Sequence, residues 1–180
     1  MRTRSWSIQL LAAGTLFSFA ACGGDKAPAT DSAAETPAAD SAAGATPVTT
    51  TASAAMAAGE QVFARCIACH QATGQGLPGA FPPLSGSEWV TGPVDKPIAI
   101  VLHGMQGPIT VAGTTYNSLM MAYGTGAPMT DEEVANVLTY VRASFGNNAS
   151  AVSVEDVARV RAATASRTTP WTVAELEAMK

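Results

Sequence analysis

The sequence predicts an all-α domain over residues 56–150, followed by a short helical extension over residues 151–180. Helix signals near Met56 and at Thr130 bracket a loop-rich segment that has little strand pattern. Of the 180 residues, 47% are hydrophobic but only 6% are aromatic, and alanine accounts for much of the hydrophobic share. Alanine buries little area, so this composition indicates that a non-protein group helps to fill the centre of the domain.

Residues 1–21 have the pattern of a bacterial lipoprotein signal peptide. Two arginines precede an apolar run that is shorter than the ~20 residues of a spanning helix. The run ends in Phe19-Ala20-Ala21-Cys22, which resembles a lipobox. We therefore expect Cys22 to be lipidated and the protein to be periplasmic, or otherwise extracytoplasmic, and anchored to a membrane. An ordinary signal peptide cut near Cys22 and an uncleaved anchor are the alternatives.

Residues 22–55 are predicted to form a disordered linker. They consist mainly of alanine, proline, threonine, serine and aspartate, with no aromatic residue. Such a segment buries too little apolar surface to offset its conformational entropy. We expect it to tether the folded domain to the anchor.

The motif with the most specific chemistry is Cys66-Ile67-Ala68-Cys69-His70. C-x-x-C-H is the attachment signature of one covalent haem c. On a helical turn its two thiols and its imidazole project to one side, so the cysteines can bond the two vinyl groups of the haem while His70 reaches the haem iron. A thioredoxin-type pair would need a βαβ setting, and a structural zinc site would need a second ligand pair.

Helices follow from local patterns on both sides of this motif. Residues 56–69 carry one apolar stripe that includes Gly59 and Phe63. A short helix is expected over residues 98–103, and residues 107–111 and 114–116 are expected to be extended or looped.

The capping box at Thr130 starts a helix that ends near Gly146. In the extension, Ser153-Val154-Glu155-Asp156 and Trp171-Thr172-Val173-Ala174-Glu175 open two shorter helices.

Together these residues resemble the class I cytochromes c, over about residues 56–177. The resemblance implies the cytochrome c fold, in which helices wrap around one covalently attached haem. It also implies that Gly59 and Phe63 meet Val137, Tyr140 and Val141. The stretch 81–86, Phe-Pro-Pro-Leu-Ser-Gly, matches a segment that lines the haem on the histidine side. There Pro83 is expected to border the haem, and a carbonyl at or near it to accept a hydrogen bond from the imidazole.

The same resemblance implies that the second axial ligand is a methionine. Residues 116–124 resemble the family's Y-N-x-x-M segment, which places the ligand at Met120 and makes His70 and Met120 the metal ligands. Three alternatives stay open. Met121 stands where the family has proline, Met129 is expected to pack on Val134 before the cap, and His103 would give bis-histidine ligation.

A haem held on both faces has no open position, which implies a single-electron carrier rather than an enzyme, without a small-molecule substrate. The expected partners are redox proteins, namely a dehydrogenase or respiratory complex and a terminal oxidase or reductase. The extension resembles a branch that serves as subunits or modules of quinoprotein dehydrogenases and copper nitrite reductases. A fixed dehydrogenase subunit and a haem-based CO or NO sensor are the alternatives.

The overall charge bears on the partners. The net charge of −4 argues against a nucleic-acid-binding protein, which needs a basic face. It also leads us to expect a partner with a positive docking patch.

Overall fold

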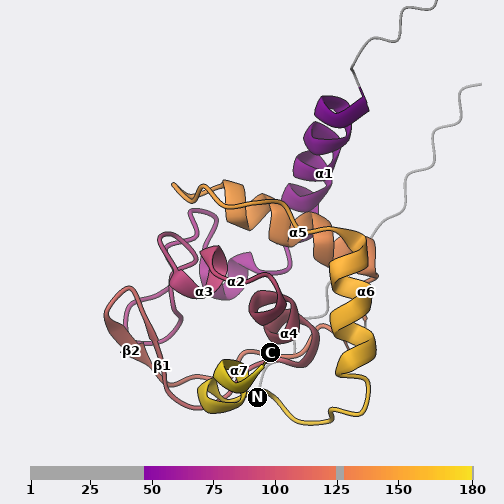
Figure 1. The fold of residues 1–180 in the computed structure, drawn as a ribbon. Helices are drawn as coiled ribbons and strands as arrows, with labels where there is room; N and C mark the ends of the chain where they lie inside the picture. Colours follow the sequence, from indigo (N-terminus) through magenta and orange to yellow (C-terminus); the bar gives the residue numbers. More distant parts are fainter. Residues whose placement is uncertain (1–46, 125–127, 180) are drawn as a thin grey trace, which may run out of the picture. The chain divides into compact units, whose positions relative to one another are not determined.

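The fold is mostly helical, as predicted, and carries one small β-hairpin (Figure 1). A computed structural model describes residues 47–124 and 128–179, with side chains from residue 52 onward. The signal peptide, Cys22 and most of the linker lie outside these residues. The elements are α1 (Pro47–Phe63), α2 (Ile67–His70), α3 (Glu88–Thr91), α4 (Asp95–His103), β1 (Ile109–Val111), β2 (Thr114–Tyr116), α5 (Asp131–Ala143), α6 (Val154–Ala163) and α7 (Val173–Ala178).

Helix α1 differs from its prediction at both ends. It begins at Pro47 rather than at Met56, so the last part of the predicted linker is helical. Proline suits a first helical position, and the alanines after it have the highest helix propensity. The helix then ends at Phe63 instead of running on to Cys69. A turn over residues 64–66 separates it from α2.

Helices α1 and α5 cross at Gly59 (Figure 1). A Cβ built on Gly59 would lie 2.1 Å from the carbonyl oxygen of Asn136 and 2.7 Å from Cβ of Tyr140. Close to this crossing, the ring of Phe63 lies 5.5 Å from Tyr140 and 5.2 Å from Phe145, centroid to centroid. The predicted meeting of Gly59 and Phe63 with Tyr140 is therefore observed.

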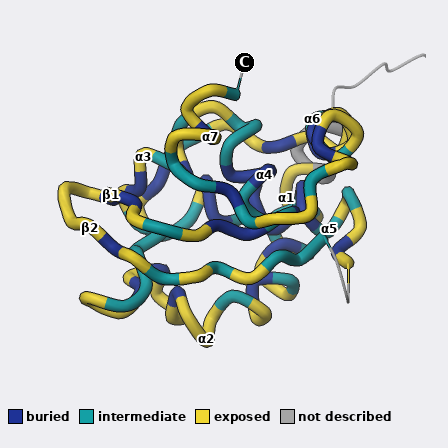
Figure 2. The backbone as a smooth tube through the Cα atoms, turned by 90° about the horizontal axis from the view of Figure 1, so that it is seen from below, coloured by how far each residue is buried: buried dark blue, intermediate teal, exposed yellow. Residues whose placement is uncertain are grey.

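Helix α4 forms the buried centre (Figure 2). Ile98, Ala99 and Leu102 are at most 1% exposed. Helices α5 and α6 both pack on α4, so the first helix of the C-terminal extension belongs to the same core. Val157 and Val160 of α6 are buried there.

Three capping boxes start helices where the sequence predicts them. Thr130 and Glu133 cap α5, Ser153 and Asp156 cap α6, and Thr172 and Glu175 cap α7. At the far end of α5, the buried side chain of Arg142 donates hydrogen bonds to the carbonyls of Val90, Gly92 and Ser150. These bonds tie the end of α5 to α3 and to the start of the extension.

The residues predicted to be extended or looped pair as an antiparallel hairpin, with Ile109 opposite Tyr116 and Val111 opposite Thr114. Its two-residue turn has φ of 48° at Ala112 and 78° at Gly113, as type I′ turns require. Within residues 47–124 and 128–179, no helix combines the length and the apolar character that crossing a bilayer requires.

Candidate haem site

The C-x-x-C-H motif sits on a single helical turn. Cys66 is the N-cap of α2, with φ −99° and ψ −19°, and its carbonyl accepts hydrogen bonds from the backbone N–H of Cys69 (3.2 Å) and of His70 (2.9 Å). Cys66 is half-buried and Cys69 is exposed. His70 is buried at the end of the turn. The motif thus occupies the single helical turn that its spacing predicts.

The His70 ring is held by a backbone carbonyl. Its Nδ1 lies 3.0 Å from the oxygen of Pro82, so the ring donates to Pro82 and leaves the lone pair of Nε2 free. The sequence predicts this acceptor at or near Pro83, and in the structure it is the carbonyl of the adjacent Pro82. Burial lowers the pKa of His70, an effect that the Pro82 bond opposes, so the imidazole is neutral at neutral pH and suited to bind iron.

The raised pKa of the Cys66 thiol argues against a thiol-redox pair. Burial, reinforced by the neighbouring Cys69, raises the pKa of Cys66 to about 11. A reactive C-x-x-C cysteine has a lowered pKa. Two cysteines and a neutral, oriented histidine on one turn form the donor set of a c-type haem. The residues present therefore fit that group, with Cys66 and Cys69 as its covalent attachments and His70 as one iron ligand.

Met120 lies on a strand-like segment that pairs with Met105. The N–H of Met105 donates to the carbonyl of Met120 (3.1 Å), and the N–H of Met120 donates back (2.9 Å). Gly104 permits the close approach, since a Cβ there would lie 2.4 Å from the Met120 carbonyl oxygen. The Met120 side chain is half-buried against the core, whereas that of Met121 is 68% exposed.

The other two candidate ligands are engaged elsewhere. Met129 is 3% exposed and, like Val134, belongs to the core before α5, as a hydrophobic staple would require. The Nε2 of His103 lies 2.8 Å from the hydroxyl of Thr164, and its ring stands edge-on to Trp171. Ligation by Met120 stays a prediction, and these placements describe only how Met129 and His103 are engaged.

Two hydrogen bonds that sequence reasoning missed tie the Met120 segment to the histidine side. Tyr123 donates from its hydroxyl to the carbonyl of Arg65, next to Cys66, over 3.1 Å. Ser118 donates to the carbonyl of Ala80 over 2.6 Å. Both residues lie in the stretch already singled out for its methionine, but nothing in a single sequence shows which distant carbonyls they reach.

The loop that supplies Pro82 is fixed on the end of α5. Gly74, at φ +68°, lies so close to the Phe145 ring that an added Cβ would be 2.5 Å from Cγ. Asn147 donates to the Leu84 carbonyl (3.0 Å) and accepts from the N–H of Gly86 (2.9 Å). The loop that carries the imidazole acceptor is thereby held by residues 145–147, which directly follow α5.

Trp89 is half-buried against the core. Its indole N–H donates to the carbonyl of Thr110 over 2.9 Å and so ties α3 to β1.

Comparison with known proteins agrees with this geometry. A family model described as "Cytochrome c" matches residues 56–144. A cytochrome c-552 of Thermus thermophilus is 41% identical over 93 residues, which cover 49% of this chain and 69% of that protein. A second cytochrome c-552 of the same species is 41% identical over 97 residues, 52% of this chain and 64% of the relative. The fructose dehydrogenase cytochrome subunit of Gluconobacter japonicus is 38% identical over 105 residues, 54% of this chain but only 20% of that subunit. The chain thus spans just under two thirds of one cytochrome c-552 and a fifth of the dehydrogenase subunit.

Proposed function

The chain belongs to the cytochrome c family, whose cofactor is covalent haem c, and on that premise we propose that it is a membrane-tethered, extracytoplasmic monohaem cytochrome c. It carries single electrons between a donor, either a dehydrogenase or a respiratory complex, and a terminal oxidase or reductase. The observation that carries the proposal is the turn of Cys66, Cys69 and His70, with His70 oriented by Pro82.

Each residue has a distinct task. Cys66 and Cys69 would attach the group, while burial keeps His70 neutral and the Pro82 carbonyl orients its ring. Met120, held by its pairing with Met105, presents its thioether as the second ligand. Haem c bound in this way supplies a one-electron couple at an iron without an open position. The protein is therefore a carrier rather than a catalyst.

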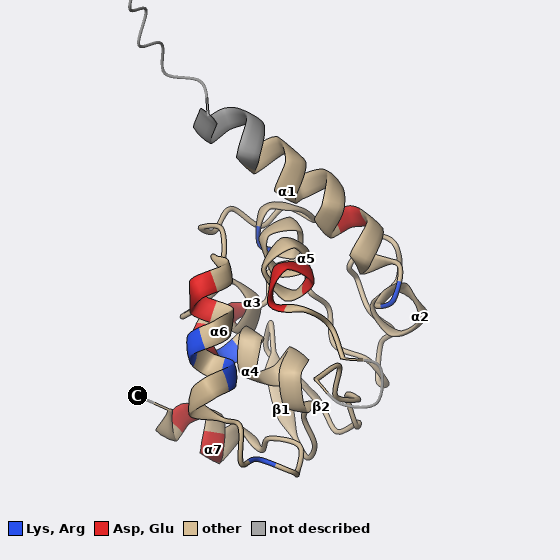
Figure 3. Ribbon diagram, turned by 90° about the vertical axis from the view of Figure 1, so that its right-hand side faces the viewer, with Lys and Arg blue, Asp and Glu red and all other residues tan. Residues whose placement is uncertain are grey.

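The segments that carry these ligands are uncharged. Residues 66–87 and 97–130 contain no lysine, arginine, aspartate or glutamate. They expose Ile67 (38%), Leu77 (48%), Leu119 (59%) and Met121 (68%). Many of the charged residues lie instead on α5, α6 and α7 (Figure 3), and beside the hairpin Glu88 accepts a hydrogen bond from the N–H of Ala112. This distribution argues against the expectation of a positive docking patch on the partner, and we propose contact with an apolar patch instead.

A fixed place within a dehydrogenase complex is the second candidate. It is supported by the similarity to cytochrome subunits of the fructose and gluconate dehydrogenases. In that case the protein would co-purify with a quinoprotein or flavoprotein subunit. A freely exchanging carrier would be released alone. Anchoring through Cys22 is tested separately, by mass spectrometry of the amino-terminal peptide from membranes.

The carrier is distinguished from a gas sensor by two measurements on the haem-loaded protein. We expect a reversible one-electron titration and no binding of CO to the reduced form at neutral pH, because both axial positions are filled. Ready CO binding by the wild-type protein would contradict the proposal and favour the sensor.

A further inference from the structure

The C-terminal extension contributes backbone to the segment that carries Met120. Met105 pairs with Met120 on one side and, in parallel, with Trp171 on the other. The N–H of Trp171 donates to the carbonyl of Gly104 (3.0 Å), and the N–H of Gln106 donates to the carbonyl of Trp171 (2.8 Å). Residues 120, 105 and 171, with the backbone hydrogen bonds between their segments, therefore form a three-stranded ladder, here called the ladder.

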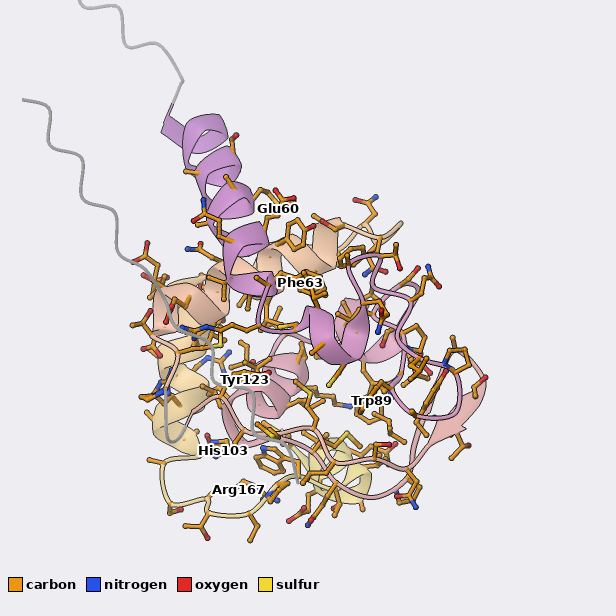
Figure 4. The ribbon with its side chains drawn as sticks, turned by 180° about the vertical axis from the view of Figure 1, so that it is seen from behind. Glu60, Phe63, Trp89, His103, Tyr123 and Arg167 are labelled. Atoms are coloured by element: carbon orange, nitrogen blue, oxygen red, sulfur yellow. The ribbon has the colours of Figure 1, made fainter. Side chains whose placement is uncertain are left out.

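The outer strand of the ladder is firmly held. Trp171 is 8% exposed, and the guanidinium carbon of Arg167 lies 3.5 Å from the centroid of its ring. Arg167 also donates to the Pro170 carbonyl (3.0 Å) and to the Glu175 carboxylate (2.8 Å). Figure 4 shows His103 and Arg167 together at one end of the molecule, away from Phe63. Trp171 lies between them, with the His103 ring 6.3 Å away.

The strand at Trp171 stabilises the pairing between Met105 and Met120. An isolated pair of short strands is marginally stable, and a third strand with a packed face makes it persistent. The bond between Met105 and Met120 is one bridge long, and Gly104 passes directly beneath the Met120 carbonyl. Gly104 also accepts the N–H of Trp171. A shift of Trp171 therefore moves the same backbone on which Met120 rests.

We propose that Trp171, clamped by Arg167, is a positioning residue for the Met120 ligand, so that the extension controls how often the methionine leaves the iron. The inference rests on the proposed role of Met120 as ligand. Trp171 acts through the backbone of residues 104–106. Its role is to lower the population in which the sixth position is open.

This population can be measured with free imidazole, which binds ferric haem only when the methionine has detached. The apparent affinity scales with the open fraction. Trp171→Ala keeps both backbone hydrogen bonds but removes the buried ring that anchors this strand, so we expect it to raise the apparent imidazole affinity about tenfold. Arg167→Gln leaves the ring in place and removes only the guanidinium that packs on it, so the rise should be about threefold.

A conservative variant tests the mechanism. Within the described residues, the indole N–H of Trp171 is buried and has no hydrogen-bond partner. Trp171→Phe keeps an aromatic ring under Arg167 and loses no hydrogen bond, so we expect imidazole affinity close to that of the wild type.

Two controls separate positioning from general loss of stability. Val157→Ala opens a cavity in α6, where Val157 is 0% exposed, and leaves the ladder intact. Arg159→Gln removes an arginine of the same extension that binds Asp95 and Asp156 instead. Both should leave imidazole affinity within about twofold of the wild type, even where they lower the unfolding temperature.

The experiment is an imidazole titration of each haem-loaded variant, well below its unfolding temperature and with its circular dichroism checked. Wild-type affinity in both Trp171→Ala and Arg167→Gln, or the same rise in the two controls, would overturn the proposal. If Trp171→Ala does not fold, the imidazole affinities of Arg167→Gln and Arg159→Gln are compared. A rise in Arg167→Gln alone supports the proposal, and equal affinities overturn it. Met120→Ala keeping the ferric methionine–iron charge-transfer band would instead overturn the ligand assignment itself.

Discussion

Adding one methyl group at Gly59 should force α1 and α5 apart. The new Cβ would lie 2.1 Å from the Asn136 carbonyl oxygen and 2.7 Å from Cβ of Tyr140, against ordinary contact distances of about 3.5 Å. The obstacle is backbone, so the helices must separate by about 1 Å. A gap of that size forfeits a quarter to a half of each contact energy along the crossing.

The magnitude follows from two opposing effects. Alanine should stabilise α1 by about 0.5–1 kcal/mol through helix propensity, whereas overpacking costs about 1–3 kcal/mol. With a backbone obstacle the upper range applies, so Gly59→Ala should lower the free energy of unfolding by about 2 kcal/mol. The midpoint of thermal unfolding should fall by roughly 5 °C or more.

The assay is thermal and chemical unfolding of the haem-loaded protein. Ala57→Gly is the matched control, because Ala57 is an exposed residue of the same helix and reports the propensity effect alone. A Gly59→Ala protein as stable as the wild type, or more stable, would refute the crossing described here.

Three further predictions concern other parts of the molecule. Arg142→Met removes the hydrogen bonds from this side chain to the carbonyls of Val90, Gly92 and Ser150. It should lower the free energy of unfolding by about 3 kcal/mol in a denaturant titration, and a loss under about 1 kcal/mol would contradict this. Hydrogen bonding from Arg167, then from Thr172, lowers the pKa of Glu175 to about 2 from its ordinary 4.5. A carboxylate with a lowered pKa stabilises the fold above pH 4.5 and ceases to do so as the pH falls through 2. In Glu175→Gln the free energy of unfolding should therefore fall less between pH 4.5 and 2 than in the wild type. The same fall in both proteins would contradict this prediction. Finally, electron exchange with a protein partner should change less than about threefold between low and physiological salt, whereas a steep dependence would show charged docking.

The helix starts and the turn of the C-x-x-C-H motif could be predicted from the sequence because each depends on residues close together in the chain. The three capping boxes need only residues three apart, and C-x-x-C-H needs one helical turn. The crossing at Gly59 came from a family resemblance rather than from the spacing alone. The early start of α1 was missed because low hydrophobicity suggested disorder, whereas alanine also favours helix.

Non-local backbone contacts could not be predicted. The imidazole acceptor could be predicted only as a carbonyl at or near Pro83, since neighbouring carbonyls in a proline-rich loop look alike in a sequence, and it is that of Pro82. Likewise, the pairing of Trp171 with Met105 depends on backbone groups that every residue possesses. Sequence reasoning therefore identified the extension as helical but not its strand next to the methionine segment.

The most direct test of the account is the ferric optical spectrum of the haem-loaded protein and two adjacent methionine variants. Met120 is half-buried against the core, and Met121 is 68% exposed. We predict a methionine–iron charge-transfer band in the wild type and in Met121→Ala, and its loss in Met120→Ala. A band that survives in Met120→Ala, or disappears in Met121→Ala, would contradict ligation by His70 and Met120.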